Sequence, residues 1–145
     1  MKRFTVLFFV LVSELSWAQK EPFARVQSFF EAFHQRDSIQ LTHHFDPEAK
    51  LLFTSNDPQG RPKQKKLTVH EFIVRVSTRA DQPIWEEKIG EPIITQHQNL
   101  ATVWVPFEFY LDGNFSHSGH NLFQLFWNGS NWKIVFLSDT RESTK

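Results

Sequence analysis

Two turn dipeptides, Asp112-Gly113 and Asn128-Gly129, constrain the fold of this chain more than any other feature of its sequence. Both dipeptides favour the two-residue turn whose twist suits an antiparallel hairpin. The runs around them are rich in aromatic and β-branched residues, as strands usually are. Together with the segment before them, these runs predict strands over residues 85–97, 99–110, 115–127 and 131–140. The C-terminal half is therefore predicted to be an antiparallel meander.

The N-terminal half carries helical patterns instead. Pro22 suits the first turn of a helix, and apolar residues follow it at helical spacing at Phe23, Val26, Phe30 and Phe33. A second, shorter helix is predicted next, capped by Asp37 or Ser38 and ending before Asp46-Pro47.

A strand, a turn and a third helix come between these helices and the meander. Residues 49–55 predict the strand, and residues 68–71, Thr-Val-His-Glu, form a capping box that opens the helix. The basic run from Lys63 to Lys66 is interpreted as a solvated edge strand, with contact to an anion as the alternative. Helices followed by a meander indicate an α+β fold, in which the helices cover one face of the sheet.

The turn at Asp112-Gly113 decides which side chains share a face of that sheet. With two residues in the turn, Glu108 lies directly across from His117, because side chains alternate along each strand. The same face carries Trp104, Tyr110 and Asn121 at its polar end and Trp132 at its apolar end. We interpret it as the lining of a pocket that is sealed at the apolar end.

Glu108 and His117 are the candidate catalytic residues of this pocket. A carboxylate beside an imidazole orients the ring and keeps it basic, so that it can move a proton at neutral pH. The alternative is a structural cross-strand pair worth about 0.5 kcal/mol.

Five further residues are candidates for binding a ligand. Trp104 can stack on a flat molecule, and Tyr110 and Asn121 can form hydrogen bonds with a carbonyl or hydroxyl group. Phe30 and Phe33 face the sheet from the first helix, either as core residues or as the wall of the pocket.

The opposite face of the meander is nearly as apolar, which usually marks a contact with a partner. We expect a homodimer interface there, with His120, Asp139 and Arg141 at its rim. The residues predicted to form this interface are Val103, Val105, Phe107, Leu122, Val135 and Leu137.

The first 18 residues have the pattern of an export signal. Lys2 and Arg3 precede a short apolar run, and Ser16-Trp17-Ala18 places small residues where a signal peptidase reads them. The run is about half of the roughly 20 residues that a membrane span needs. We therefore expect cleavage after Ala18, a single domain over residues 19–145, and a periplasmic or secreted protein that keeps no membrane segment.

Composition excludes several classes of function. The chain has 16 basic and 16 acidic residues, so it lacks the positive charge that nucleic acids attract. It has no cysteine, and adjacent His43-His44 and opposed His117 and His120 are poorly placed to chelate, so no metal site is predicted. Its 16 Phe and five Trp suit a large core or a pocket lined with rings, which would take a small apolar or aromatic ligand.

Three segments resemble the nuclear transport factor 2-like superfamily, and within it a group of exported bacterial proteins known as SnoaL-like or lumazine-binding. They are VQSFFEAFHQRD, LATVWVPFEFYLDGNFSHSGHNLFQLF and NWKIVFLSDTR, over residues 26–37, 100–126 and 131–141. The resemblance implies a curved antiparallel sheet, a cystatin-like roll, around a cone-shaped pocket closed by N-terminal helices. It also implies a dimer through the outer sheet face, but it assigns no catalytic residue, because the fold serves both enzymes and binding proteins.

Three functions remain open on this basis. The first is an exported protein that binds a small molecule in its pocket without turning it over. The second is a cofactor-free isomerase, dehydratase or cyclase that uses Glu108 and His117. The third is a non-catalytic assembly domain that acts through the outer face of its sheet.

Overall fold

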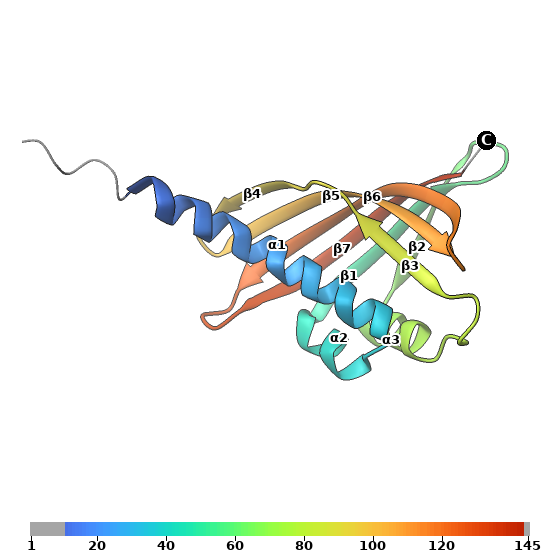
Figure 1. The fold of residues 1–145 in the computed structure, drawn as a ribbon, viewed down its shortest axis with the longest axis horizontal. Helices are drawn as coiled ribbons and strands as arrows, with labels where there is room; N and C mark the ends of the chain where they lie inside the picture. Colours follow the sequence, from blue (N-terminus) through green and yellow to red (C-terminus); the bar gives the residue numbers. More distant parts are fainter. Residues whose placement is uncertain (1–10, 144–145) are drawn as a thin grey trace, which may run out of the picture.

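The computed structural model describes residues 11–143, which form helices packed on a curved sheet that does not close (Figure 1). The helices are α1 (Leu11–Gln35), α2 (Ser38–His44) and α3 (Val69–Ser77). The strands are β1 (Phe45–Asn56), β2 (Pro62–Leu67), β3 (Trp85–Ile89), β4 (Ile93–His97), β5 (Leu100–Leu111), β6 (Asn114–Trp127) and β7 (Trp132–Ser143). No helix among the described residues combines the length and the apolar character needed to cross a membrane.

The strands form one sheet in the order β2-β1-β7-β6-β5-β3, and β4 also pairs with β5. All neighbours are antiparallel except β1 and β7, which run parallel. The helices cover the concave face of the sheet (Figure 1). The predicted α+β class is therefore confirmed, as is the placement of the basic run at an edge, since β2 is the outermost strand.

Both predicted helix caps are present. The Asp37 side chain accepts hydrogen bonds from the backbone N–H groups of Ile39 and Gln40, at 3.0 and 2.9 Å. Thr68 Oγ1 accepts from the Glu71 N–H at 3.1 Å, and the Glu71 carboxylate accepts from the Thr68 N–H at 2.7 Å. Each cap satisfies N–H groups that a first helical turn leaves without partners.

Two elements differ from the prediction in their extent. Helix α1 is described from Leu11 onward, so Pro22 lies inside it, and residues 11–21 contain no glycine or further proline that would end the helix. The strand predicted over residues 85–97 is divided into β3 and β4, which pair with opposite ends of β5. Between them lie Gly90 and Pro92, and a proline cannot donate a hydrogen bond to a neighbouring strand.

The turn at Asp112-Gly113 has two residues, as predicted, but the ladder behind it is irregular. Leu111 pairs with Asn114 and Tyr110 with Phe115, and then a β-bulge leaves Ser116 out of register, so that Phe109 pairs with His117. A bulge inserts one residue and exchanges the faces of everything beyond it. Glu108 consequently pairs with Ser118, and the predicted pairing of Glu108 with His117 is wrong.

The second predicted turn is longer than two residues. Trp127 pairs with Trp132, and the Asn128 side chain accepts hydrogen bonds from the N–H groups of Ser130 and Asn131, each at 3.0 Å. This local hydrogen bonding by an Asn side chain stabilises a four-residue loop in place of the tighter turn. A second register shift lies at Val135, because Leu125 pairs with Ile134 while Gln124 pairs with Phe136.

These shifts turn the apolar side chains of β5 and β7 toward the helices. Val103, Val105, Phe107 and Leu137 are at most 4% exposed, so they belong to the concave side of the sheet. Their predicted role in a dimer interface is therefore wrong. Of the six residues predicted for that interface, Leu122 and Val135 remain outside this buried set.

Phe29 stands at the centre of the core. Its ring centroid lies 5.2–6.5 Å from those of six other rings, which come from α1, α2, β1, α3 and β6. The six are Phe30, Phe33, His44, Phe45, Phe72 and Phe123. Aromatic packing of this kind joins the helices to the sheet and explains part of the high phenylalanine content.

Candidate functional site

A cavity of about 740 Å³ lies between the helices and the concave face of the sheet. Its walls come from α1, α3 and six strands, and aromatic rings supply much of their surface. The aromatic lining consists of Phe29, Phe30, Phe33, Phe53, Phe72, Trp85, Phe107, Phe109 and Phe123. Cavities of this size and lining are typical of sites for small organic molecules.

Polar and charged side chains also line the cavity. Those from β3, β6 and β7 include Glu87, His117, Asn121, Asp139 and Arg141. The strands approach closely here because Gly119 lacks a side chain. A Cβ atom at this position would lie 1.8 Å from the backbone oxygen of Thr140, so glycine is required.

Glu87 is held by a side chain and by its own backbone. Asn121 Nδ2 donates a hydrogen bond to Glu87 Oε1 at 2.7 Å, and the Glu87 N–H donates to His34 Nε2 at 3.0 Å. Burial raises the pKa of Glu87 to about 7, with Asp139 adding to the rise while Asn121 and Arg141 oppose it. This carboxyl group can therefore both hold and release a proton near neutral pH.

Asp139 and Arg141 form an ion pair beside Glu87. Arg141 Nε donates to Asp139 Oδ2 at 3.1 Å, and the Thr54 N–H donates to Asp139 Oδ1 at 3.3 Å. Asp139 is 5% exposed, and burial raises its pKa although Arg141 and the Thr54 N–H act in the opposite direction. Asp139 thus fixes the position of the arginine from the inside of the cavity.

His117 lies in the cavity, and within residues 11–143 no carboxylate is paired with it across the strands. Its ring stacks on Phe109 at 4.9 Å between centroids and meets the edge of Phe107 at 5.9 Å. Its Nδ1 lies 3.1 Å from Ser116 Oγ. Burial, followed by the charge of Arg141, lowers the pKa of His117, so the neutral imidazole is favoured.

Four of the seven predicted site residues line the cavity, and three do not. Phe30, Phe33, His117 and Asn121 are in the lining. Trp104, Glu108 and Tyr110 lie on the convex face because of the bulge at Ser116. Their roles in the pocket are corrected accordingly.

The convex residues contact one another instead of a ligand site. Tyr110 Oη donates to Glu108 Oε2 at 2.7 Å, and the Trp104 ring stacks on His120 at 4.9 Å. The proposed acid–base pair of Glu108 and His117 is therefore divided between opposite faces of the sheet.

Glu87, Asp139 and Arg141 were missed as pocket residues. A signal for Glu87 was available, because Trp85, Glu87 and Ile89 alternate with charged residues and so share one face of β3. A regular register places Asp139 and Arg141 at the rim of the outer face. The register shift at Val135 turns their side chains into the cavity. No local sequence pattern marks that shift.

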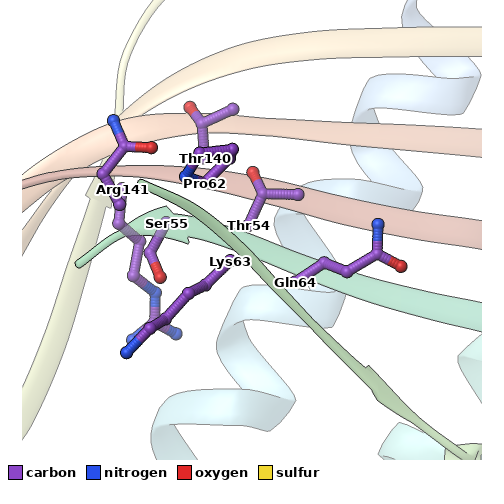
Figure 2. Close-up of a pocket in the computed structure, with 8 residues that line it drawn as sticks. Thr54, Ser55, Pro62, Lys63, Gln64, Thr140 and Arg141 are labelled. Atoms are coloured by element: carbon purple, nitrogen blue, oxygen red, sulfur yellow. The ribbon is translucent and has the colours of Figure 1, made fainter. Parts of the chain in front are cut away.

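One end of the cavity opens into a groove of about 450 Å³, shown in Figure 2. The groove is formed by the ends of β1, β2 and β7. Thr54, Ser55, Lys63, Gln64 and Arg141 line both the groove and the cavity, so the two spaces are continuous. Within residues 11–143, no group of three His, Asp or Glu side chains is arranged to hold a metal ion.

Comparison with known proteins finds similar folds but no similar sequence. No protein-family model matches the chain, and no curated protein matches it. A nuclear transport factor 2-like superfamily protein from Salmonella enterica serovar Typhimurium aligns with a TM-score of 0.68 at 14% identity, over 90% of this chain and 95% of that one. A protein of unknown function with a cystatin-like fold from Nostoc punctiforme aligns at 0.65 and 13%, over 94% and 96%.

A third similar structure is described as an enzyme subunit. It comes from Novosphingobium aromaticivorans, is described as a candidate beta subunit of an aromatic-ring-hydroxylating dioxygenase, and aligns at 0.71 with 11% identity over 92% of this chain and 94% of that one. Identities this low show a shared fold and nothing finer.

Proposed function

The chain has the nuclear transport factor 2-like fold, and we propose that it binds a small, flat and largely apolar molecule in the cavity on the concave face of its sheet. The observation that carries this proposal is the cavity of about 740 Å³, with aromatic walls and a hydrogen-bonded carboxyl–amide pair inside it. Rings on the walls favour a flat ligand, and a few convergent polar groups fix its orientation.

Asn121 and Glu87 are the groups that would recognise a polar atom of the ligand. Asn121 Nδ2 already donates to Glu87, which leaves the second N–H of the amide and the second carboxyl oxygen of Glu87 for a carbonyl or hydroxyl group. His117 adds its Nε2 on the same side of the sheet. Asn121 and His117 were predicted for the pocket, and Glu87 takes the place of Glu108, Tyr110 and Trp104 beside them.

Native mass spectrometry of the protein purified from its own host tests this function. We expect a bound molecule of small mass, released when the protein is denatured. The released molecule is then titrated into the wild type, Asn121→Leu and, as a matched control on the exposed face of β3, Glu86→Gln. Binding that is lost in Asn121→Leu and kept in Glu86→Gln supports the proposal, and equal binding by all three contradicts it.

Proton transfer is the second candidate function, and the pKa of about 7 for Glu87 favours it. A carboxyl group with this pKa can take a proton from one atom of the ligand and return it to another, as in a cofactor-free isomerisation. Glu87→Gln separates the two functions. If the protein is an isomerase, the wild type converts the released molecule and the variant does not, whereas a binding protein converts it in neither form.

We also propose that two copies pair through the convex face of the sheet. This face carries Trp104 and Phe126, which are 38% and 39% exposed, and Leu122 lies directly across from Trp104 on the neighbouring strand. A contiguous apolar face on a small domain usually has a partner. A role confined to assembly is the third candidate, and its support is the fold shared with the Novosphingobium chain.

Export remains our proposal for the location of the protein. Residues 1–10 lie outside the described part of the chain, and residues 11–18 form the first turns of α1, which project beyond the sheet in Figure 1. The α1 residues whose burial in the core is described, from Val26 to Phe33, follow Ala18, so cleavage there leaves them in place. N-terminal sequencing of the protein from an envelope fraction tests the proposal, and a chain that starts at Met1 contradicts it.

A further inference from the structure

Basic side chains gather where the cavity meets the groove. Lys63, Lys65, Arg75 and Arg141 are all in the cavity lining, and Lys63 and Arg141 also line the groove. The charges of Arg75 and Lys65 also act on Glu71, whose pKa is lowered first by its hydrogen bonds with Thr68. Lys63 and Arg141 are the two cations that line both the cavity and the groove.

The register of the edge strand turns Lys63 toward the concave side. Lys63 pairs with Ser55 and Lys65 with Phe53, whereas Lys66 pairs with Leu52 on the alternate face. Phe53 lines the cavity, so Lys63, which lies two residues from Lys65 along β2, points to the same side. Figure 2 shows the Lys63 and Arg141 side chains extending in the same direction, while Gln64 points away.

Arg141 is held with part of its guanidinium group unused. Its Nε donates to the buried Asp139 carboxylate, which in turn accepts from the Thr54 N–H. Among the described residues, neither Nη group of Arg141 has a hydrogen bond. A guanidinium group anchored at Nε presents its remaining N–H groups in the planar geometry that suits a carboxylate, sulfate or phosphate group.

None of the described residues that line the groove is acidic. Besides the two cations, its lining offers the hydroxyl groups of Ser55 and Thr140, which can donate to an oxyanion, whereas Thr54 Oγ1 already donates to the Asp139 backbone oxygen at 2.7 Å. Lys63 has no ion pair within the described residues. An anion placed here would therefore meet hydrogen-bond donors from three strands and no opposing carboxylate except Asp139, which is engaged by Arg141.

We propose that the groove binds the anionic group of an amphiphilic ligand whose flat apolar body lies in the aromatic cavity. The ligand class is thus a small organic acid, with a carboxylate, sulfate or phosphate group at one end. This inference rests on the proposed binding function and adds the charge of the ligand and its orientation. Lys63 and Arg141 contact the anion, and Asp139 is a positioning residue that holds Arg141.

Inward-pointing lysines have another use, since charges on an edge strand prevent it from pairing with other chains. That use requires only a charge on β2, so Lys63 and Lys66 would be equivalent in it. Binding of an anion requires Lys63 and Arg141 in particular. The two explanations therefore differ in which substitution matters.

Two fluorescent probes with the same aromatic body test the inference. 8-Anilinonaphthalene-1-sulfonate carries an anionic group, and N-phenyl-1-naphthylamine is the same molecule without it. We expect the wild type to bind the sulfonate at least about tenfold more tightly than the neutral probe in dilute salt. Added sodium chloride should weaken the binding of the sulfonate and leave the binding of the neutral probe unchanged.

The variants are Lys63→Gln, Arg141→Gln and, as the control on the alternate face, Lys66→Gln. Lys63→Gln should reduce the affinity for the sulfonate about fivefold or more and leave the affinity for the neutral probe within about twofold of the wild-type value. Because Arg141→Gln leaves the buried Asp139 without its partner, its fold is checked by circular dichroism, and Lys63→Gln provides the decisive result if that variant unfolds.

The outcomes separate this inference from the proposed function. If both probes bind equally, or if Lys66→Gln has the same effect as Lys63→Gln, the anionic subsite is refuted while the cavity remains a binding site. If neither probe binds, the proposed function fails and the inference fails with it.

Discussion

Replacing Glu87 by glutamine should stabilise the protein at neutral and alkaline pH. The amide has the shape of the carboxyl group and can still accept the hydrogen bond from Asn121, but it cannot ionise. Burial raises the pKa of Glu87 from 4.5 to about 7 in the folded protein. The folded wild type must therefore either keep a proton on Glu87 or bury a negative charge there. The glutamine side chain requires neither.

The size of this effect follows from linkage between proton binding and folding. Below pH 4.5 the carboxyl group is protonated in both states, so it makes no difference to stability. Between pH 4.5 and about 7 the folded state holds a proton that the unfolded state has lost, so stability falls as the pH rises. Above about pH 7 the loss of stability is complete. At about 1.36 kcal/mol for each unit of difference in pKa, the loss amounts to about 3 kcal/mol.

Urea unfolding of the wild type and Glu87→Gln at pH 4.5, 6 and 8 measures this difference. We expect the two proteins to be equally stable at pH 4.5, and the variant to be about 3 kcal/mol more stable at pH 8, roughly 10 °C in Tm. Glu86→Gln, at an exposed position on the same strand, should match the wild type throughout. A difference between Glu87→Gln and the wild type that does not change with pH would refute the argument that burial controls this carboxyl group.

Three further predictions concern the fold and its assembly. Gly119→Ala should cost several kcal/mol in the free energy of unfolding, measured with urea, because its Cβ would collide with the Thr140 backbone oxygen; a cost below about 1 kcal/mol would contradict this. Burial lowers the pKa of His44 to about 4, so the wild type should lose up to about 3 kcal/mol as the pH falls from about 6.5 to 4. In the same assay, His44→Gln should lose less stability than the wild type over this pH range. If the variant loses as much stability as the wild type, His44 is not responsible. Leu122→Lys should convert a dimer to a monomer in light scattering, whereas a mass that does not change would exclude the convex face as the interface.

His44 and Glu87 affect the pH dependence in opposite directions. From pH 4.5 to 6.5 the histidine makes stability rise with pH and the glutamate makes it fall, so the two partly cancel in the wild type. Only the difference between a variant and the wild type isolates either group. A flat stability curve for the wild type is therefore consistent with two strongly perturbed residues.

The sequence predicted the elements of the fold better than it predicted the faces of the sheet. The caps at Asp37 and Thr68 and the turn at Asp112-Gly113 depend on a few adjacent residues, and all three are confirmed. The side of the sheet on which Glu108 lies depends on whether β5 and β6 pair regularly behind the turn. Packing against the helices decides that pairing. Val105 and Phe107 are buried only if they face α1 and α3, and the bulge at Ser116 allows the tight turn and this burial together.

The candidate site was predicted in part for the same reason. Asn121 and His117 lie on β6 beyond the bulge and were placed on the concave face, as the structure has them. Glu108 and Trp104 lie on β5 and were assigned to the wrong side. Asp139 and Arg141 required a second shift, at Val135, that depends on how β7 packs between β1 and β6.

The bulge at Ser116 also lets the tip of the hairpin change in length without turning over the residues that line the cavity. Because a bulge absorbs a change of one residue in length, an insertion or deletion near the tip can be compensated at Ser116 without reversing the strands behind it. The tip can therefore vary in length and composition among descendants of this chain while the cavity keeps the same inward residues. Alignments that allow no gap at this position would pair inward residues of one homologue with outward residues of another.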